Sequence, residues 1–467
     1  MNYPFWDIPH LGSAWVIGII AIFHVMISQF AVGGGFYLPL AERKALRMTD
    51  QKLRKEWLAQ LASHSKFFYL VTGIYGTVSG VGIWFAIGLT HPEATSTLIH
   101  NFVFGWAIEW VFFIVELTTI AVYYATWGKI DEKLHLVVGW VYAGASVCTL
   151  IIINGILSFM LTPGDTWISV AGTGAEASKF WNAFFNPTYW PSLCLRMCVC
   201  ASLAAVWALI TSSRIDGYKQ PELKTSLVQW SVKWLIPSFV LTPFIMGWYL
   251  WMVPAAQRIL LTLGMDTTSP GTFSTVTRIA LITIVTSATI IGVAYFLAYK
   301  NAVEFSLPHA LSLLLLALMA TGAGEYSREM LRKPFVIGRW MYSNGVRVPY
   351  VNRINQEGYL AHSNWVWNGD GAATPSAYSR GEAIFRGECG SCHTLDGYRP
   401  LRQLLSGRDR ANIGNFVQML HEYKPDSPYH HYMPPMTGTK QDVDDLTDYL
   451  NYQVNPPSAA MTKIAQK

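Results

Sequence analysis

The sequence predicts an all-α membrane protein in which eight transmembrane helices precede a small all-α domain. Hydrophobic residues make up 52% of the 467 residues and charged residues only 13%, about half the charged share of a typical soluble domain. The apolar residues gather in long runs, each long enough to cross a bilayer as a helix. After about residue 335 these runs stop and the composition becomes polar.

Eight apolar runs are interpreted as spanning helices. They lie near residues 12–40, 67–90, 100–127, 134–160, 188–213, 230–254, 273–299 and 305–324. Helices are expected because a segment in lipid must satisfy its own backbone hydrogen bonds, unless it belongs to a closed barrel. These runs are far longer than the strands of a membrane barrel.

Basic residues gather in alternate loops, and this pattern predicts the orientation in the membrane. The first, third and fifth loops carry Arg43, Lys44, Arg47, Lys52, Arg54, Lys55, Lys66, Lys129, Lys133, Arg214, Lys219 and Lys224. The loops between them hold almost no lysine or arginine. The odd loops are therefore expected in the cytoplasm and both chain ends on the outer face. The net charge of +5 has its source in the first loop and indicates no nucleic-acid partner.

The composition divides the chain into three parts. Residues 1–335 form the predicted bundle, and the start of the chain lacks the basic segment of a cleavable signal peptide, so the first helix is expected to be retained. Residues 336–372 are polar and rich in Asn, Gly, Trp and Tyr, and they are interpreted as an ordered linker on the outer face. Residues 373–467 form the predicted soluble domain.

The sequence C-G-S-C-H at 389–393 is the strongest chemical signal in the chain. In this motif the thiols of Cys389 and Cys392 add to the two vinyl groups of a c-type haem. His393 then supplies the proximal nitrogen to the iron. The alternative is a redox or zinc-binding cysteine pair beside an incidental histidine. The motif predicts one covalent haem c.

The surroundings of this motif, from R-G-E-A-I-F at 380–385 onward, resemble the class I cytochromes c. The resemblance implies a methionine as the sixth iron ligand, and M-P-P-M at 433–436 supplies two. Met433 is expected because that family places its ligand at the start of an M-P-P sequence, and Met436 is the alternative. A thioether ligand makes the iron low-spin and raises its reduction potential.

Ionisable and polar side chains inside the predicted spans are candidates for function, because burying them in lipid is costly. They are His24, Glu109, Glu116, Asn154, Arg196, Arg278, Glu325 and Arg328. Glu109 and Glu116 are seven residues apart, so both lie on one face of their helix. A single buried histidine such as His24 can also be a hydrogen-bonded structural residue, and this alternative stays open.

Several different short motifs are distributed along the spans. They are A-I-F-H at 21–24, A-I-E at 107–109, K-L-H at 133–135, N-G at 154–155, N-P at 186–187 and G-E-Y-S-R at 324–328. With these motifs, residues 10–335 resemble subunit I of the cytochrome bd quinol oxidases. The resemblance implies that His24 and Glu325 ligate two non-covalent high-spin haems, of type b, type d or both. It also implies that Glu109 and Glu116 lie beside this pair on a proton route, whereas a neutral, hydrogen-bonded acidic pair is the alternative.

The chain departs from this family at the ligands of the third, low-spin haem. Leu195 and Ala280 occupy the positions of its histidine and methionine ligands, and neither can bind iron. The long quinol-binding loop is reduced to 255–272. Haem c is therefore expected to replace the missing haem. Arg196 and Arg278 would pair with haem propionates, or alternatively extend to lipid headgroups.

The resemblance implies an oxidoreductase subunit of a respiratory chain in a bacterial inner membrane, with the cytochrome c domain on the periplasmic face. The first hypothesis is a terminal oxidase that takes electrons from an outer-face cytochrome c or similar donor and reduces dioxygen to water. The alternative is an electron-transfer subunit that passes electrons between quinol and cytochrome c without oxygen reduction. A scaffold that has lost its haems is the third possibility. A second bd-like membrane subunit is the expected partner, in a heterodimer or larger complex.

Overall fold

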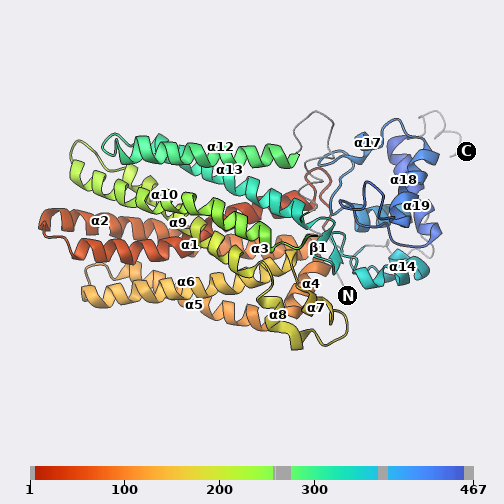
Figure 1. Ribbon diagram of the computed structural model, residues 1–467, viewed down its shortest axis with the longest axis horizontal. Helices are drawn as coiled ribbons and strands as arrows, with labels where there is room; N and C mark the ends of the chain where they lie inside the picture. Colours follow the sequence, from red (N-terminus) through yellow and green to blue (C-terminus); the bar gives the residue numbers. More distant parts are fainter. Residues whose placement is uncertain (1–5, 256–257, 259–274, 367–376, 457–467) are drawn as a thin grey trace, which may run out of the picture.

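The computed structural model describes residues 6–255, 258, 275–366 and 377–456. Figure 1 shows long helices that run side by side along the longest axis, with the C-terminal helices gathered at one end. We call this end of the bundle, where the first long helix begins and the last one finishes, the junction end. The opposite end is the far end.

Eight helical segments of the described chain are long and apolar enough to cross a membrane, which confirms the predicted bundle. They are α1 (Ser13–Leu46), α2 (Gln51–Phe68) joined through Tyr69–Gly76 to α3 (Thr77–Thr90), α5 (Val103–Ala125), α6 (Glu132–Leu161), α9 (Tyr189–Ser213), α10 (Pro221–Met252), α12 (Thr275–Gly292) continued by Val293–Tyr299, and α13 (Leu307–Arg332). The short helices α4 (Pro92–Asn101), α7 (Asp165–Ile168) and α8 (Phe180–Phe184) lie between them.

Several boundaries of the spans differ from the prediction, among them the start of α10 at Pro221 instead of residue 230. The basic segment before residue 67 was expected as a loop, but it is helical from Gln51. Asp50 caps this helix by accepting hydrogen bonds from the backbone of Lys52 at 2.9 Å and of Leu53 at 3.0 Å. Hydrophobic residues on the other face of α2 are buried, so α2 is an amphipathic helix and the basic side chains lie on its polar face. The last span was expected to end at residue 324 and instead continues to Arg332.

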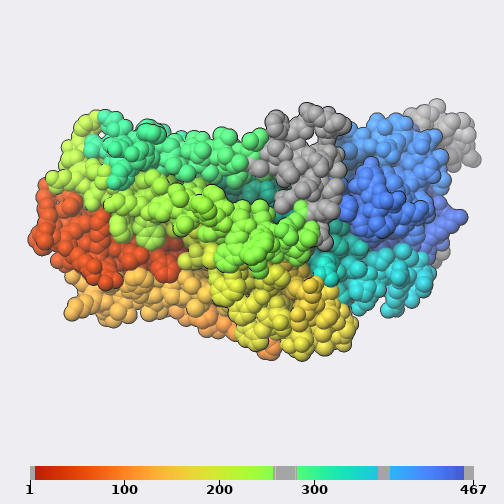
Figure 2. Space-filling view, in the orientation of Figure 1, coloured from red at the N-terminus to blue at the C-terminus, as the bar shows by residue number. Residues whose placement is uncertain are grey.

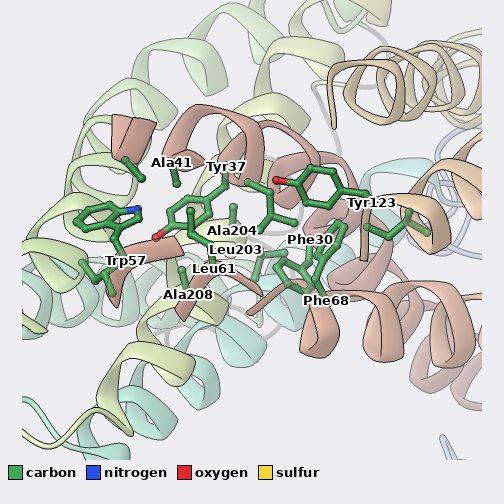
Figure 3. Close-up of a cluster of buried hydrophobic side chains, with 14 of the residues drawn as sticks. Phe30, Tyr37, Ala41, Trp57, Leu61, Phe68, Tyr123, Leu203, Ala204 and Ala208 are labelled. Atoms are coloured by element: carbon green, nitrogen blue, oxygen red, sulfur yellow. The ribbon is translucent and has the colours of Figure 1, made fainter. Parts of the chain in front are cut away.

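One core cluster of the bundle lies toward the far end. Figure 3 shows Phe30 and Tyr37 of α1 meeting Trp57, Leu61 and Phe68 of α2, with small residues of α9 beside them. The helices approach closely here, since a Cβ added at Gly33 would lie 1.9 Å from the carbonyl oxygen of Cys200. This half of the bundle is therefore tightly packed.

The junction end has a second core around Phe102, Phe159 and Trp167, but two stretches of helix at this end are not buried. None of the residues 14–25 on α1 and none of the residues 318–330 on α13 is buried. A Cβ added at Gly18 or Gly324 would meet no atom within 4 Å. Other described side chains therefore do not enclose these two stretches, and their surface is open to lipid or to a bound group.

Beyond α13 the chain forms one hairpin and a set of short helices. The elements are β1 (Phe335–Ile337), β2 (Met341–Tyr342), α14 (Val351–Glu357), α15 (Tyr359–His362), α16 (Ala377–Ile384), α17 (Leu401–Leu404), α18 (Arg410–Glu422) and α19 (Lys440–Val454). The two antiparallel strands are the one sheet among the described residues, so the all-α class is confirmed. Figure 2 shows the segment after α13, in cyan, between the bundle and the C-terminal helices in blue.

Helices α16 and α19 cross in close contact in the C-terminal domain. A Cβ added at Gly381 would lie 2.2 Å from the carbonyl oxygen of Asp445 and 2.7 Å from the Cβ of Tyr449, so only glycine fits this crossing. Next to it, Arg380 forms ion pairs of 2.7 Å with both Asp442 and Asp445. This crossing holds the helix that leads into C-G-S-C-H against the last helix of the domain.

Candidate functional site

Helix α16 ends at Ile384 and is followed by a π-helical turn from Phe385 to Cys389. The haem-attachment motif begins at the last residue of this turn. The backbone N–H groups of Cys392 and His393 donate to the carbonyl of Cys389 at 3.0 and 2.9 Å, which closes a tight turn. Nδ1 of His393 lies 3.0 Å from the carbonyl oxygen of Arg399. A carbonyl can only accept, so Nδ1 carries the proton and Nε2 is free to bind a metal. Both cysteines are free thiols and partly exposed, as haem attachment requires.

The two candidate methionine ligands differ in their surroundings. Met436 is 4% exposed and packs in the hydrophobic core of the domain with Ile413 and Val417. Met433 is partly exposed and lies outside this core.

Glu388, next to the first cysteine, was missed in the sequence because nothing in its spacing marks it. It is 7% exposed and accepts hydrogen bonds from the backbone N–H of Thr437 at 2.9 and 3.0 Å and from the hydroxyl of the same residue. Burial raises the pKa of its carboxyl to about 8, against the opposing effect of these hydrogen bonds. Glu388 thereby joins the motif to the segment that follows Met433 and Met436.

The shifted pKa of Glu388 predicts a pH dependence of stability. Between about pH 5 and 8 the folded domain binds a proton that the unfolded chain has released, so stability is full at low pH and is lost as the pH rises. The free energy of unfolding should fall by up to about 1.4 kcal/mol per pH unit in this window. Glu388→Gln keeps an acceptor for Thr437 and should flatten the profile. Denaturant unfolding, followed by haem c absorbance, measures both slopes.

The exposed Glu422 of the same domain provides the control, because Glu422→Gln changes a carboxylate without a buried environment. Its profile should match that of the unmodified protein. Parallel profiles for Glu388→Gln and the unmodified protein would contradict the prediction.

The segment 389–400, which we call the haem loop, rests on helices α1 and α13 at the junction end. The rings of Tyr398 and Trp15 meet edge to face at 5.8 Å, and the Tyr398 N–H donates to the carbonyl of His10 at 2.9 Å. Nη2 of Arg399 lies 4.0 Å from Sδ of Met330 of α13. These contacts join the haem loop to the two helices that carry His24 and Glu325.

Four of the predicted polar residues come together at the junction end. On α13, Arg328 pairs with Glu325 at 2.8 Å. Arg196 of α9 interacts electrostatically with both, and its Nε donates to the side-chain oxygen of Asn154 at 3.1 Å. Arg278 belongs to α12, but its side chain lies outside the described residues.

His24 lies on α1 with one ring nitrogen engaged. Ser79 Oγ donates to the carbonyl of Gly76 at 3.0 Å, so at its 3.0 Å contact with His24 it accepts from Nδ1–H. The other nitrogen, Nε2, is therefore available to a metal. A Cβ added at Gly322 of α13 would lie 3.9 Å from Ile22 of α1. Helices α1 and α13 therefore approach each other here, but the His24 ring lies against α3, where a Cβ added at Gly80 would come within 3.2 Å of its Cε1.

The two acidic residues of α5 differ in burial. Glu116 is 8% exposed and accepts a short hydrogen bond from the hydroxyl of Thr149. Glu109 lies two turns closer to the junction end, is partly exposed, and interacts electrostatically with Glu116. The structure therefore places the predicted pair on one helix face, as the spacing indicated.

A buried polar cluster near the far end was not predicted as functional. Glu42 of α1 accepts hydrogen bonds from the Tyr123 hydroxyl at 2.7 Å and contacts His135 Nδ1 at 2.8 Å. All three side chains are nearly inaccessible. Tyr123 lies seven residues beyond Glu116 on α5, and hence on the same face.

A cavity of about 510 Å³ lies between the haem loop, the end of α3 and the segment after β2. Its lining includes His91, Glu93, Arg347 and His393. Glu93 holds Arg347 at 2.6 Å and accepts from the Trp365 indole at 3.0 Å. Burial and the charge of Lys333 lower the pKa of His91 to about 4, so this imidazole is neutral at neutral pH.

Comparisons with known proteins agree with this architecture. Residues 13–249 match the family model of cytochrome bd terminal oxidase subunit I, and residues 378–453 match cytochrome c. The solved structure of a bd oxidase from Geobacillus thermodenitrificans is similar in fold, with a TM-score of 0.55 and 14% identity over 69% of this chain and 87% of that chain. No curated protein matches. The chain therefore belongs to the cytochrome bd terminal oxidase subunit I family, as a multi-pass membrane oxidoreductase of respiratory electron transfer with a covalent haem c in a C-terminal cytochrome c domain.

Proposed function

We propose that this protein is the haem-bearing subunit of a bd-like terminal oxidase, in which electrons enter at haem c and reduce dioxygen to water. One observation carries the proposal. The haem loop contacts Trp15 of α1 through Tyr398 and Met330 of α13 through Arg399. His24 and Glu325, the proposed ligands of the membrane haems, belong to these two helices. Electrons that reach haem c are thereby delivered directly to the oxygen-reducing site.

The proposed ligands fit two non-covalent haems of type b, type d or both. The Nδ1–H of His24 is held by Ser79, so its Nε2 is directed elsewhere, and the carboxylate of Glu325 is only partly exposed. Residues 14–25 and 318–330 are not buried by the rest of the described chain, which is compatible with a bulky group packed against them. When bound, a haem with an open iron position supplies the binding and reduction of dioxygen.

The cationic residues at the junction end are proposed to hold haem propionates. Arg196 and Arg328 interact with one carboxylate, that of Glu325, so positive charge is in excess. Buried charges need partners, and the acidic propionates would supply them. Arg332 Nε, buried without a hydrogen-bond partner among the described residues, is a further donor of this kind. Arg278 stays a predicted propionate partner.

Met433 is the proposed sixth ligand of haem c. Its side chain is partly exposed and outside the core, whereas Met436 fills a core position that it would have to leave. The carbonyl of Arg399 accepts from Nδ1–H of His393, which fixes the ring and leaves Nε2 for the iron. A low-spin iron with a raised potential suits a carrier that accepts electrons from outside.

Glu116 and Glu109 are proposed to carry protons toward the membrane haems. A carboxyl group can accept and release a proton, and Thr149 orients that of Glu116. Glu42, His135 and Tyr123 extend this line of polar groups toward the far end. This end is the proposed cytoplasmic side, because the basic loops lie there.

The remaining proposals concern location and partners. We place the bundle (1–335) in a bacterial inner membrane, with the linker (336–372) and the cytochrome c domain (373–467) on the periplasmic face. The donor is an outer-face cytochrome c or a similar carrier, and a second bd-like membrane subunit completes the complex. The short segment 255–272 and the missing ligand at Leu195 argue against the quinol entry route of the family.

Carbon monoxide difference spectra of the purified, reduced protein test the proposal. A high-spin haem with an open position binds carbon monoxide, so a difference signal from a non-covalent haem is expected. If every membrane haem is low-spin and unreactive, the oxidase proposal is wrong. The alternative, an electron-transfer subunit between quinol and cytochrome c, would then hold.

A further inference from the structure

A charge cluster lies at the end of α13 and in the residue that follows it. Residues 329–334 read E-M-L-R-K-P. The carboxylate of Glu329 pairs with Arg332 through a short contact and with Lys333 at 3.0 Å. The Arg332 and Lys333 side chains are only 11% and 10% exposed. One carboxylate thus balances two cations, and one positive charge is left over.

Lys333 directs its ammonium group at the haem-attachment site. Nζ of Lys333 lies 3.5 Å from Sγ of Cys392, and this sulfur stands for the thioether that joins the protein to a haem vinyl group. Ser343 Oγ lies 3.9 Å from the same sulfur. Neither a thioether nor a hydroxyl neutralises an ammonium group, so the positive charge of Lys333 is felt at the haem-attachment site.

We propose that Lys333 is a positioning residue that couples the reduction of haem c to the docking of the haem loop on α13. Ferric haem carries one more positive charge than ferrous haem. A nearby buried cation therefore disfavours the ferric form and raises the reduction potential, with little screening by salt. Because Lys333 directly follows α13 and Cys392 belongs to the cytochrome c domain, haem c experiences this charge only while the haem loop is docked.

Thermodynamic reciprocity adds a second consequence. If docking favours reduction by a given factor, reduction favours docking by the same factor. In the step itself, one electron passes from a reduced outer-face carrier to ferric haem c, the carrier is oxidised, and no bond forms or breaks. The haem loop is then held more tightly on α1 and α13 at the moment when haem c carries the electron. This inference rests on the proposed role of haem c as the entry point.

Spectroelectrochemical titration of haem c in the full-length protein tests the charge effect. Lys333→Met should raise the ratio of oxidised to reduced haem c at a fixed applied potential about tenfold, equivalent to about 59 mV for one electron. Lys333→Arg keeps the charge and should change the ratio less than twofold. The exposed Lys424, which pairs with Glu422 in the same domain, supplies the matched control Lys424→Met with a similarly small effect.

Hydrogen exchange at the Tyr398 amide tests the docking effect, because this N–H donates to His10 across the junction. Exchange should be up to about tenfold slower in reduced than in oxidised protein, and Lys333→Met should abolish the difference. An unchanged potential in Lys333→Met, or an equal loss in Lys333→Arg, would overturn the inference. Both readouts concern haem c alone, so their failure is distinguishable from a failure of the oxygen chemistry.

Discussion

Replacing His24 with alanine is expected to remove one non-covalent haem from the purified protein while the covalent haem c remains. The imidazole is the proposed iron ligand, and its Nδ1–H is already held by Ser79. An alanine side chain offers no donor atom, so the haem would lose its bond to α1. Haem extraction followed by quantification of extractable and covalent haem measures the outcome directly.

Two further variants sharpen this test. Ser79→Ala keeps the ligand but frees the imidazole, and loss of such a supporting contact typically weakens metal binding about 10–100-fold. It should therefore give partial haem loss. His100 is exposed, and His100→Ala should leave both haem types at their normal amounts. A His24→Ala protein with its full complement of extractable haem would show that His24 is a structural residue.

Replacing Glu116 with glutamine should reduce oxygen consumption on the order of 100-fold, the typical contribution of a positioned proton-transfer group. Glutamine can still accept the hydrogen bond from Thr149, so the packing of α5 against α6 is retained. An amide does not carry a proton at neutral pH, so proton delivery stops there. Haem content and the reduction of haem c by an artificial donor should stay unchanged. An oxygen electrode and visible spectra measure the two quantities separately.

The matched control for this variant is Glu132→Gln. Glu132 is exposed near the start of α6, where it pairs with Arg54 at 2.7 Å, and its replacement should leave turnover unchanged. Full turnover in Glu116→Gln would instead support the alternative that Glu109 and Glu116 are a neutral, hydrogen-bonded structural pair.

Features that depend on neighbouring residues in the sequence could be predicted, whereas features that depend on contacts between distant residues could not. The eight spans could be predicted because crossing a membrane demands a long apolar run, which is a local property. The start of α2 at Gln51 was missed because its apolar face is buried by partners distant in the sequence, such as Tyr37 of α1. The hairpin of β1 and β2 is too short to produce a strand pattern.

The same contrast holds at the site. The spacing of Glu109 and Glu116 predicted a shared helix face, and the structure agrees. The burial of Glu388 under Thr437 could not be predicted, because the two residues are 49 positions apart. The link between Glu42, His135 and Tyr123 likewise depends on helix packing.

By itself, the sequence determined the eight spans long and apolar enough to cross a membrane and the predicted haem-attachment motif at 389–393, because hydrophobic length and the C-x-x-C-H spacing are both properties of consecutive residues. Only the tertiary structure decided where the haem loop rests. Its contacts to α1 and α13 join Tyr398 to His10 and Trp15, and Lys333 to Cys392. These pairs are far apart in the chain, and which distant surfaces meet depends on the packing of the whole molecule.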